Sequence, residues 1–574
     1  MAELSTIMAT DAPDCIELAA GDTFRLALAA GEHWYGHGFN HQQPYPLESG
    51  EISADVFAVN NIQSPAWMSS AGFVLLAETV ERLGVRLNVG GNRLFELTAL
   101  DAPVRIRIFR GHNLPEAHQQ FLQYIGWPPP TPTSAQLGES LFCTWTEYPR
   151  CVTQERLLQF ARDIRAHGYP CTTIILDDRW ESCFGELAFA DDFPDPVALV
   201  QQLRAWGFAL WLWVTPFVNK EANNFSALAA AGALVPHIDG QGPALLRWWG
   251  GTAGLVDVTA PAGQEWLRSR LHYLRDVIGV TGFKIDGGDF KYQPAPDMAA
   301  WHCPPGPSGY SDALLALFEE IAPLHCETRT AWLSQRRSIL WRQGGKDSHW
   351  GLDNGLAAMV TLAQQLALLG YDLLIPDMIP GRVQTMVADM PLPTDELFVR
   401  WTEATAFLPM MQFSYAPWHY AAPTQAAAVG YAQLHASLGE YLHAQSQQRT
   451  APLVRPLWYA DPDDAALYTI PDAFLLGSDI LAAPVVTEGA VSRNVYLPRG
   501  QWRDAWTGVE YAGGLLVNHP APCPGIPIFV RTEQMELYEL LHSALCRIAR
   551  ASVSSGVTTT TYSAGLDRDL TVTG

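Results

Sequence analysis

Residues 282–289 read Gly-Phe-Lys-Ile-Asp-Gly-Gly-Asp, a short apolar strand that ends in an acidic residue and two glycines. Lys284 and Asp286 are two residues apart, so on a strand they face the same side. If that side is a barrel interior, the cation lies one layer below the carboxylate and keeps it ionised. The glycines leave the backbone beside Asp286 open to a ligand. The stretch predicts either a plain tight turn after a strand or a nucleophile beside a substrate.

The pattern of a short apolar run followed by an amphipathic stretch repeats on both sides of this segment, from about residue 136 to 450. The expected strands are residues 141–145, 172–178, 209–214, 282–286, 330–333, 371–376 and 406–413, and the expected helices are residues 154–167, 196–206, 264–278, 311–322 and 355–369. Apolar strands alternating with helices indicate a parallel sheet covered by helices. About eight repeats favour a (β/α)8 TIM barrel. A doubly wound sheet is the alternative, but no Gly-x-Gly-x-x-Gly follows a strand.

Both flanks of the barrel region contain short strands and turns. Alternating runs such as residues 24–28 and 104–108 predict an N-terminal β-sandwich over residues 1–135, and the proline-rich residues 128–133 mark its end. The catalytic barrel then covers residues 136–455, and returning strands predict a C-terminal β-sandwich over residues 456–574. The tail beyond about residue 550 is expected to be a final edge strand or disordered.

Composition excludes several functional classes. The chain has 574 residues, a formal charge of −23 and 48% hydrophobic residues, so it can build large cores. Such an acidic surface repels phosphate and anionic lipid, which argues against nucleic acid or a membrane as partner. Nine widely spaced cysteines without a Cys-x-x-Cys pair favour a reducing compartment. Because the N-terminus does not resemble a signal peptide, we expect a cytoplasmic protein; a periplasmic or secreted location stays open if a signal has been removed.

Acidic residues end several of the apolar runs. In a (β/α)8 barrel the chemistry lies at the C-terminal strand ends, where Asp177, Asp178, Asp286, Asp353 and Asp377 would meet. A single Asp at such a position is commonly a helix cap, but several converging carboxylates repel one another and indicate a functional site. No convincing serine or cysteine nucleophile is present, and His349 lacks the partners of a metal site.

Five segments, in the correct order and spanning nearly the whole chain, resemble glycoside hydrolase family 31, the retaining α-glycosidases. They are residues 257–261, 282–289, 350–353 and 375–381, together with residues 475–502 after the barrel. The resemblance implies that Asp286 is the nucleophile and that Asp353, selected by the Trp-x-x-Asp spacing, is the acid/base. Asp347 ranks second for that role. No metal or organic cofactor is implied.

The resemblance also implies a sugar pocket and a small carbohydrate substrate. Asp177 and Asp377 would bind sugar hydroxyls, and Trp213 is either a stacking platform or a core residue. The candidate substrate-binding residues are Asp177, Asp178, Trp180, Lys284, Arg342, Trp350, Asp377, Trp418, Trp145 and Trp249. By analogy with the family, a homo-oligomer is also expected.

Residues 346–355, 177–180 and 374–379 resemble the branch of the family that contains the myogenesis-regulating glycosidase, which is associated with α-galactosides. The Arg-x-His of the family's α-glucosidases is missing from residues 411–418, and Arg179 stands where they tend to have an acidic residue. We therefore expect an exo-acting α-glycosidase, most readily an α-galactosidase. The alternatives are α-glucosidase, α-xylosidase, sulfoquinovosidase or transglycosidase specificity, or a catalytically silent sugar-binding barrel.

Overall fold

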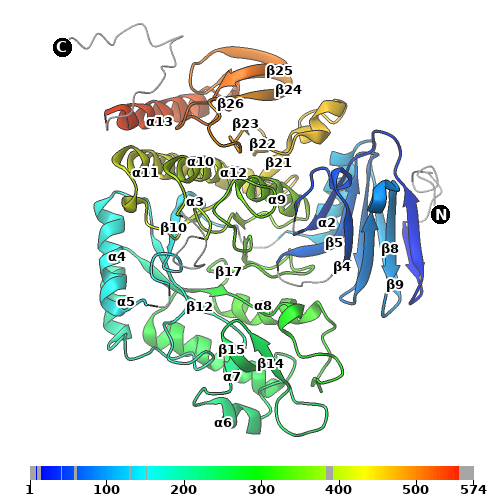
Figure 1. Cartoon of the computed structure of the whole chain (residues 1–574), viewed down its shortest axis with the longest axis vertical. Helices are drawn as coiled ribbons and strands as arrows, with labels where there is room; N and C mark the ends of the chain where they lie inside the picture. Colours follow the sequence, from blue (N-terminus) through cyan, green and yellow to red (C-terminus); the bar gives the residue numbers. More distant parts are fainter. Residues whose placement is uncertain are drawn as a thin grey trace.

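The computed structural model describes residues 8, 14–40, 42–56, 61–127, 131–149, 151–382 and 392–554. Figure 1 shows three parts, with the N-terminal sheets on the right, a barrel in the middle and the C-terminal sheet on top. Among the described residues, no helix is both long enough and apolar enough to cross a lipid bilayer.

Eight parallel strands form the barrel. They are β10 (Ser140–Cys143), β11 (Thr173–Leu176), β12 (Ala209–Val214), β16 (Gly282–Ile285), β17 (Cys326–Thr328), β18 (Leu340–Arg342), β19 (Leu374–Ile375) and β20 (Met411–Phe413). Each strand pairs with its neighbours except at one seam, where β19 and β20 are joined only by a bridge between Ile379 and Phe413. The barrel is nearly closed, which confirms the predicted fold class.

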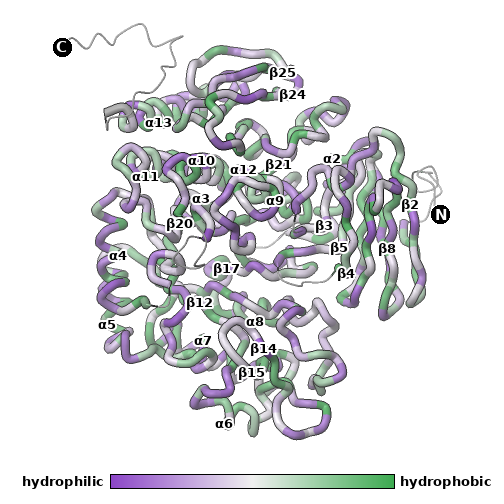
Figure 2. Tube along the Cα trace, viewed as in Figure 1, coloured by the Kyte–Doolittle hydropathy of each residue, from purple (hydrophilic) through white to green (hydrophobic). Residues whose placement is uncertain are grey.

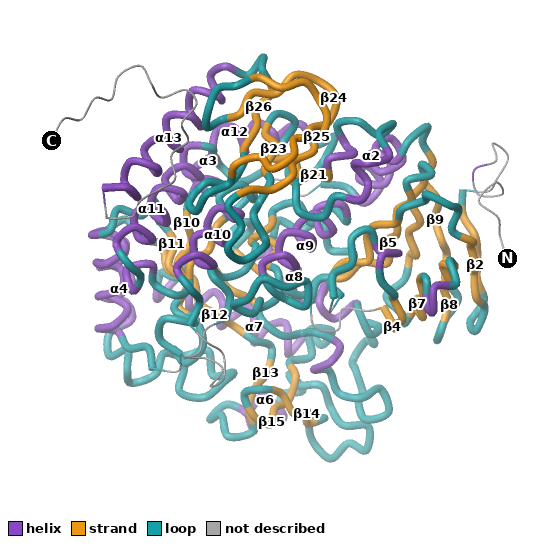
Figure 3. Tube along the Cα trace, turned by 45° about the horizontal axis from the view of Figure 1, so that its top comes forward, coloured by secondary structure: helices purple, strands orange, loops and turns teal. Residues whose placement is uncertain are grey.

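The helices lie outside these strands, as Figure 3 shows for α4 and α11 beside β10 and β11. They are α4 (Gln154–Ala166), α5 (Pro196–Ala205), α7 (Pro261–His272), α8 (Gly309–Ile321), α9 (Leu356–Leu368), α10 (Asp395–Thr405) and α11 (Ala422–Ser437). Local signals start them: Thr153 caps α4, and Asp195 caps α5 ahead of Pro196. Polar and apolar residues alternate along α4 in Figure 2 because only one of its faces packs on the barrel.

The expected strand at residues 330–333 is wrong, because that segment is a loop between β17 and β18. Trp332 is buried in the core of the N-terminal domain and donates a hydrogen bond to the Thr79 carbonyl at 2.7 Å. The two real strands are only three residues long, and each contains an interior charged residue, Glu327 or Arg342, so neither forms a long apolar run. No helix interrupts the fully described stretch between them.

The N-terminal domain is a sandwich of two antiparallel sheets. One contains β1 (Cys15–Leu18), β9 (Val104–Arg110), β6 (Phe73–Glu78), β5 (Gln63–Ser69) and β3 (Trp34–Gly38); the other contains β2 (Thr23–Ala27), β8 (Leu94–Ala99), β7 (Leu83–Leu87) and β4 (Ile52–Val56). Trp34, Trp67 and Phe95 pack in its core. Strand β3 lies against α9, and the Gly36 amide donates to Gln365 Oε1 at 2.7 Å. This domain therefore covers the outer face of α9.

The C-terminal domain contains six strands in one antiparallel sheet. They are β21 (Val454–Pro456), β22 (Phe474–Leu476), β23 (Ile480–Ala482), β24 (Ser492–Asp504), β25 (Glu510–Pro520) and β26 (Ile528–Arg531). The following helix α13 (Met535–Ser554), which the sequence analysis did not anticipate, packs against α11 of the barrel. The sequence analysis expected an edge strand or disorder in the final tail, and residues 555–574 of that tail lie outside the described part of the chain.

Candidate active site

A cavity of about 440 Å³ opens at the C-terminal ends of the barrel strands. Of the residues expected at a sugar site, it is lined by Asp286, Asp177, Lys284, Arg342, Trp145 and Trp249. The remaining lining residues are Pro149, Trp213, Tyr292, Arg329, Gly345, Met378 and Arg382. Trp249 reaches the cavity from the turn of a hairpin formed by β14 (Leu245–Trp248) and β15 (Gly251–Leu255), which is inserted between β12 and β16.

Asp286 follows β16 directly and is held on both carboxylate oxygens. Trp213 Nε1 donates to Oδ2 at 3.1 Å, and Arg329 Nε donates to Oδ1 at 2.5 Å. Burial alone would raise the pKa of this carboxyl, but the charges of Arg329 and Arg342 lower it below its ordinary value. The carboxylate is thus ionised and oriented, as a nucleophile requires.

The backbone conformation explains why glycine occupies the two positions after Asp286. Gly287 and Gly288 both have a φ of +80°, a region that favours glycine. A Cβ at Gly287 would also lie 2.5 Å from the Phe217 ring. The turn delivers Asp289, which is fully buried, accepts a short hydrogen bond from Thr330 and lies 3.5 Å from Arg329 Nη2. Arg329 therefore bridges Asp286 and Asp289.

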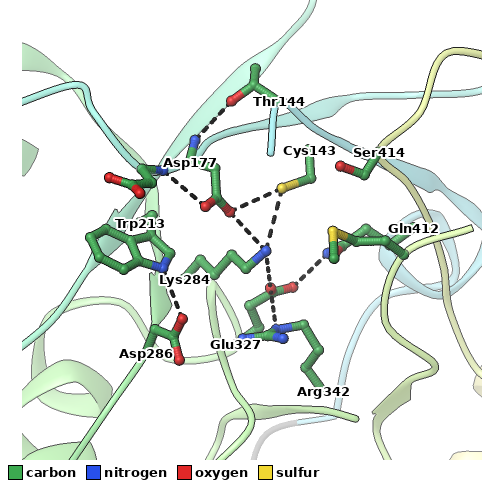
Figure 4. Close-up of polar contacts among 12 residues, drawn as sticks. Cys143, Thr144, Asp177, Trp213, Lys284, Asp286, Glu327, Arg342, Gln412 and Ser414 are labelled. Carbon is green, nitrogen blue, oxygen red and sulfur yellow. Dashed lines mark hydrogen bonds and ion pairs between the residues drawn. The ribbon is translucent and has the colours of Figure 1, made fainter. Parts of the chain in front are cut away.

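One layer below Asp286, a network of polar side chains surrounds Lys284 and Arg342, two residues that line the cavity (Figure 4). At its centre, Lys284 Nζ lies 2.8 Å from Asp177 Oδ2, 3.3 Å from Cys143 Sγ and 3.9 Å from Glu327 Oε1. Burial, the largest single influence, would lower the pKa of Lys284, but Asp177, Cys143 and Glu327 together raise that pKa above its ordinary value. We call Lys284, Glu327, Arg342 and Gln412 the polar floor.

Asp377 lies beside the polar floor and is fully buried. It accepts from Arg342 Nη1 at 3.1 Å and from the Lys346 amide at 3.3 Å. Its φ of +70° is unusual for a non-glycine residue. Burial lowers the pKa of Lys346 to about 8, although Asp377 and Asp347 oppose that shift.

The two candidate acid/base residues are placed differently. Asp353 has a side chain that is 73% exposed, lies 3.7 Å from His349 Nδ1 and does not line the cavity. Asp347 is 20% exposed and accepts from Arg382 Nε at 2.8 Å and from Asn354 Nδ2 at 2.9 Å. Arg382 lines the cavity, whereas Asp347 does not line it and contacts Arg382. Asp347 is therefore the more enclosed of the two carboxylates and is tied to the cavity wall.

Two tryptophans expected at the sugar site cannot stack on a sugar there. The Trp180 side chain is fully buried, packs on Phe189 and donates from Nε1 to the Trp213 carbonyl at 2.7 Å. Trp418 stacks on Phe142 and His167 between the barrel and its helices. The structure therefore does not bring Trp180 or Trp418 to the cavity, and neighbouring aromatic rings pack against both side chains.

Asp178 and Trp350, which were also expected at the site, do not line the cavity. Asp178 is buried next to Asp177, with Arg179 Nε 3.6 Å from its Oδ1. Trp350 is half-buried in the segment before α9. Among the described residues, no group of three or more His, Cys, Asp or Glu side chains is placed to hold a metal ion.

The sequence analysis did not identify Glu327 and Arg329 as site residues, because it placed a strand at residues 330–333 instead of at β17. It also did not identify Arg382, Tyr292 and Cys143. The alternation Cys-Glu-Thr over residues 326–328 has a period of two and could have indicated a strand with Glu327 facing inward. Arg329 and Arg382 stand in loops, and no local signal distinguishes them from other arginines.

Comparison with family models places three matches along the chain. Residues 129–445 match the glycosyl hydrolases family 31 TIM-barrel domain, and residues 450–535 match the glycosyl hydrolase family 31 C-terminal domain. Residues 17–112 match the myogenesis-regulating glycosidase N-terminal domain.

Individual relatives agree with these matches. The chain is 32% identical to the mouse myogenesis-regulating glycosidase over 533 residues, which cover 87% of this chain and 73% of the mouse protein. The fold is shared with a Flavobacterium johnsoniae dextranase complexed with glucose (TM-score 0.76, 20% identity, covering 91% of this chain and 68% of that one). It is also shared with the cycloalternan-degrading enzyme of Trueperella pyogenes in complex with a covalent intermediate (TM-score 0.75, 21% identity, covering 89% and 77%).

Proposed function

The chain belongs to glycosyl hydrolase family 31, and from this membership we propose that it is a retaining, exo-acting α-glycosidase whose substrate is a terminal α-galactoside. The observation that carries the proposal is the state of Asp286. Its carboxylate lines the cavity, is held by Trp213 and Arg329, and has a lowered pKa. The polar floor lies one layer below it, which supports attack on the end of a sugar chain.

In the first step, a carboxylate oxygen of Asp286 attacks the anomeric carbon of the bound sugar. The bond from that carbon to the leaving oxygen breaks, and a carboxylic acid donates a proton to the leaving oxygen. In the second step, the resulting carboxylate takes a proton from water. The water oxygen then displaces Asp286, which returns as a free carboxylate, and the sugar keeps its α configuration.

We assign the proton transfer to Asp347 in preference to Asp353. A retaining mechanism requires the two carboxyl groups to lie about 5–5.5 Å apart across the bond that breaks. Asp347 stands behind Arg382 at the cavity wall, whereas Asp353 points into solvent from the turn before α9. A small shift of Arg382 on substrate binding would bring the Asp347 carboxyl to the leaving oxygen, and apo geometry commonly tightens in this way.

Substitution of Asp286 tests the nucleophile. Asp286→Ala should lose nearly all activity on a nitrophenyl α-galactoside, and azide added to Asp286→Gly should give a β-galactosyl azide. Near-normal turnover by Asp286→Ala would show that another group attacks. A folded Asp286→Gly variant that yields no azide product would count against a covalent intermediate.

Asp347→Ala and Asp353→Ala form a matched pair for the acid/base. Loss of the acid slows substrates with poor leaving groups much more than activated ones, because only the former need protonation. We expect this selective loss, by about 10²-fold or more, for Asp347→Ala and not for Asp353→Ala. The reverse result would assign the role to Asp353.

The galactoside preference rests on recognition of the sugar at the polar floor. Gln412 lies in the last barrel strand, β20, and donates to Glu327 Oε2 at 2.8 Å. It stands in the stretch in which the family's α-glucosidases have a histidine. Nitrophenyl α-galactoside, α-glucoside and α-xyloside should be compared by kcat/KM. A preference for glucoside or xyloside would replace the galactoside assignment, and no turnover of any of them would favour a sugar-binding role.

We also propose that the protein works in the cytoplasm. All nine cysteines are free thiols, including the buried Cys143, Cys171 and Cys326, which is typical of a reducing compartment. Fractionation of the source cells, with detection of the native protein, tests this; recovery from the medium or an oxidising compartment would overturn it.

A further inference from the structure

The polar floor contains buried polar atoms without hydrogen-bond partners among the described residues. Arg342 Nη2 has none, although Nη1 of the same guanidinium binds Asp377. Arg342 is 3% exposed and lines the cavity. A buried donor without an acceptor lowers the stability of the fold. Because this donor belongs to a residue that lines the cavity, an oxygen of a bound ligand is a suitable partner for it.

Glu327 holds the two cations of the polar floor together. It is fully buried on β17, between Lys284 on β16 and Arg342 on β18. Its Oε1 lies 2.9 Å from Arg342 Nε and 3.9 Å from Lys284 Nζ. Without this carboxylate the two like charges would repel, and each would turn toward its other partner, Asp177 or Asp377.

Gln412 fixes the orientation of Glu327. The Gln412 amide donates to Glu327 Oε2 from β20, so the bond reaches across the barrel interior past the seam where β19 and β20 do not pair. This single contact leaves Oε1 of Glu327 for the cations. The arrangement keeps both Lys284 and Arg342 at the bottom of the cavity.

We propose that Glu327 is a specificity-determining positioning residue, which holds Lys284 and Arg342 so that they donate to the 4-hydroxyl of the bound sugar. Lys284 lies on β16, two residues before Asp286, hence one layer deeper in the barrel. A ring whose anomeric carbon meets Asp286 presents the opposite carbon, C4, to the polar floor. The inference deepens the proposed function and rests on it, because it places the reacting carbon at Asp286.

The test compares Glu327→Gln with the wild-type protein on two nitrophenyl α-glycosides, the galactoside and its 4-deoxy analogue. Sites built to bind a hydroxyl reject analogues that lack it, so the wild-type kcat/KM should favour the galactoside by about 10²-fold or more. Glu327→Gln should reduce that ratio to about 10 or less, because the analogue has no bond to lose at the polar floor. An unchanged ratio would overturn the inference.

Glu181→Gln is the matched control. Glu181 is also buried, but it accepts hydrogen bonds from the backbone amides of Gly185 and Leu187 and does not line the cavity. It should leave the ratio unchanged, and an equal fall in both variants would mean that the effect is structural and would overturn the inference. Should Glu327→Gln not fold, Gln412→Met removes only the bond that orients Glu327, and it should lower the ratio in the same direction.

The same experiment separates this inference from the proposed function. Galactose and glucose differ only at C4, so their 4-deoxy glycosides are one compound. If the protein hydrolyses the glucoside instead, the galactoside assignment fails while the glucoside-to-deoxy ratio still tests the polar floor. If no glycoside is turned over, calorimetric binding of galactose, glucose and the 4-deoxy hexose replaces the rates. Equal affinities for all three would then overturn the role of the polar floor.

Discussion

Replacing Arg329 by glutamine should move the acid limb of the pH–activity profile to higher pH. The nucleophile must be ionised, so kcat/KM falls as the pH drops through the pKa of Asp286. Arg329 lowers that pKa, with help from Arg342, Trp213 and Lys284, while burial opposes it. Removing the guanidinium favours the protonated form, and activity should be lost at a pH at which the wild-type protein still works.

The contact sets the size of the shift. The Arg329 guanidinium bonds Asp286 Oδ1 at 2.5 Å, and both side chains are more than four-fifths buried. An opposite charge this close typically lowers a carboxyl pKa by about 1–3 units. Since one unit corresponds to about 1.4 kcal/mol, the ion pair favours the ionised form by about 1.4–4 kcal/mol. We therefore expect the acid limb to rise by about 1–3 pH units.

The assay is the pH dependence of kcat/KM on a nitrophenyl α-glycoside, which reports the free enzyme. Arg329→Lys keeps the charge and should recover much of the wild-type profile. Arg337→Gln is the control, because Arg337 pairs with Asp312 and Glu319 and none of these three residues lines the cavity. An acid limb that stays in place in a folded Arg329→Gln protein would refute the coupling between Arg329 and Asp286.

Three further substitutions follow from the structure. Trp418→Ala should lower the free energy of unfolding by about 2–4 kcal/mol without raising KM, since its ring packs on Phe142 and His167 rather than on substrate; urea unfolding and kinetics check this. Trp249→Ala should raise KM by about 3–10-fold through lost stacking on the sugar, with the largest effect on long substrates. Burial raises the pKa of Asp372 to about 7 in the folded protein, whereas the unfolded chain loses this proton at about pH 4. The free energy of unfolding therefore falls as the pH rises from about 4 to 7. Asp372→Asn should therefore stabilise the protein by up to about 4 kcal/mol at pH 8 and by less at pH 5 in urea unfolding; equal gains at both would contradict the assignment.

Much of the barrel could be predicted because its signals are local. Strands such as residues 209–214 are continuous apolar runs, and helices such as α4 carry both a cap and one apolar face. The prediction failed at β17 and β18, where short strands carry interior charges. Trp332, which lies between them, packs in the core of the N-terminal domain instead. A hydrophobic pattern records that a side chain is buried, but not which of two cores buries it.

The position of Asp286 two residues after Lys284, before a pair of glycines, follows from the chain alone, because alternation along a strand is a property of the backbone. Folding in three dimensions brings Arg329 and Glu327 to these residues from the next strand and its loop, covers Trp180 and Trp418 with aromatic rings, and leaves Asp353 in solvent while Asp347 meets Arg382. These outcomes depend on contacts between segments that are far apart in the chain. Charge pairing and exposure at the site are therefore set by packing, which no local spacing encodes.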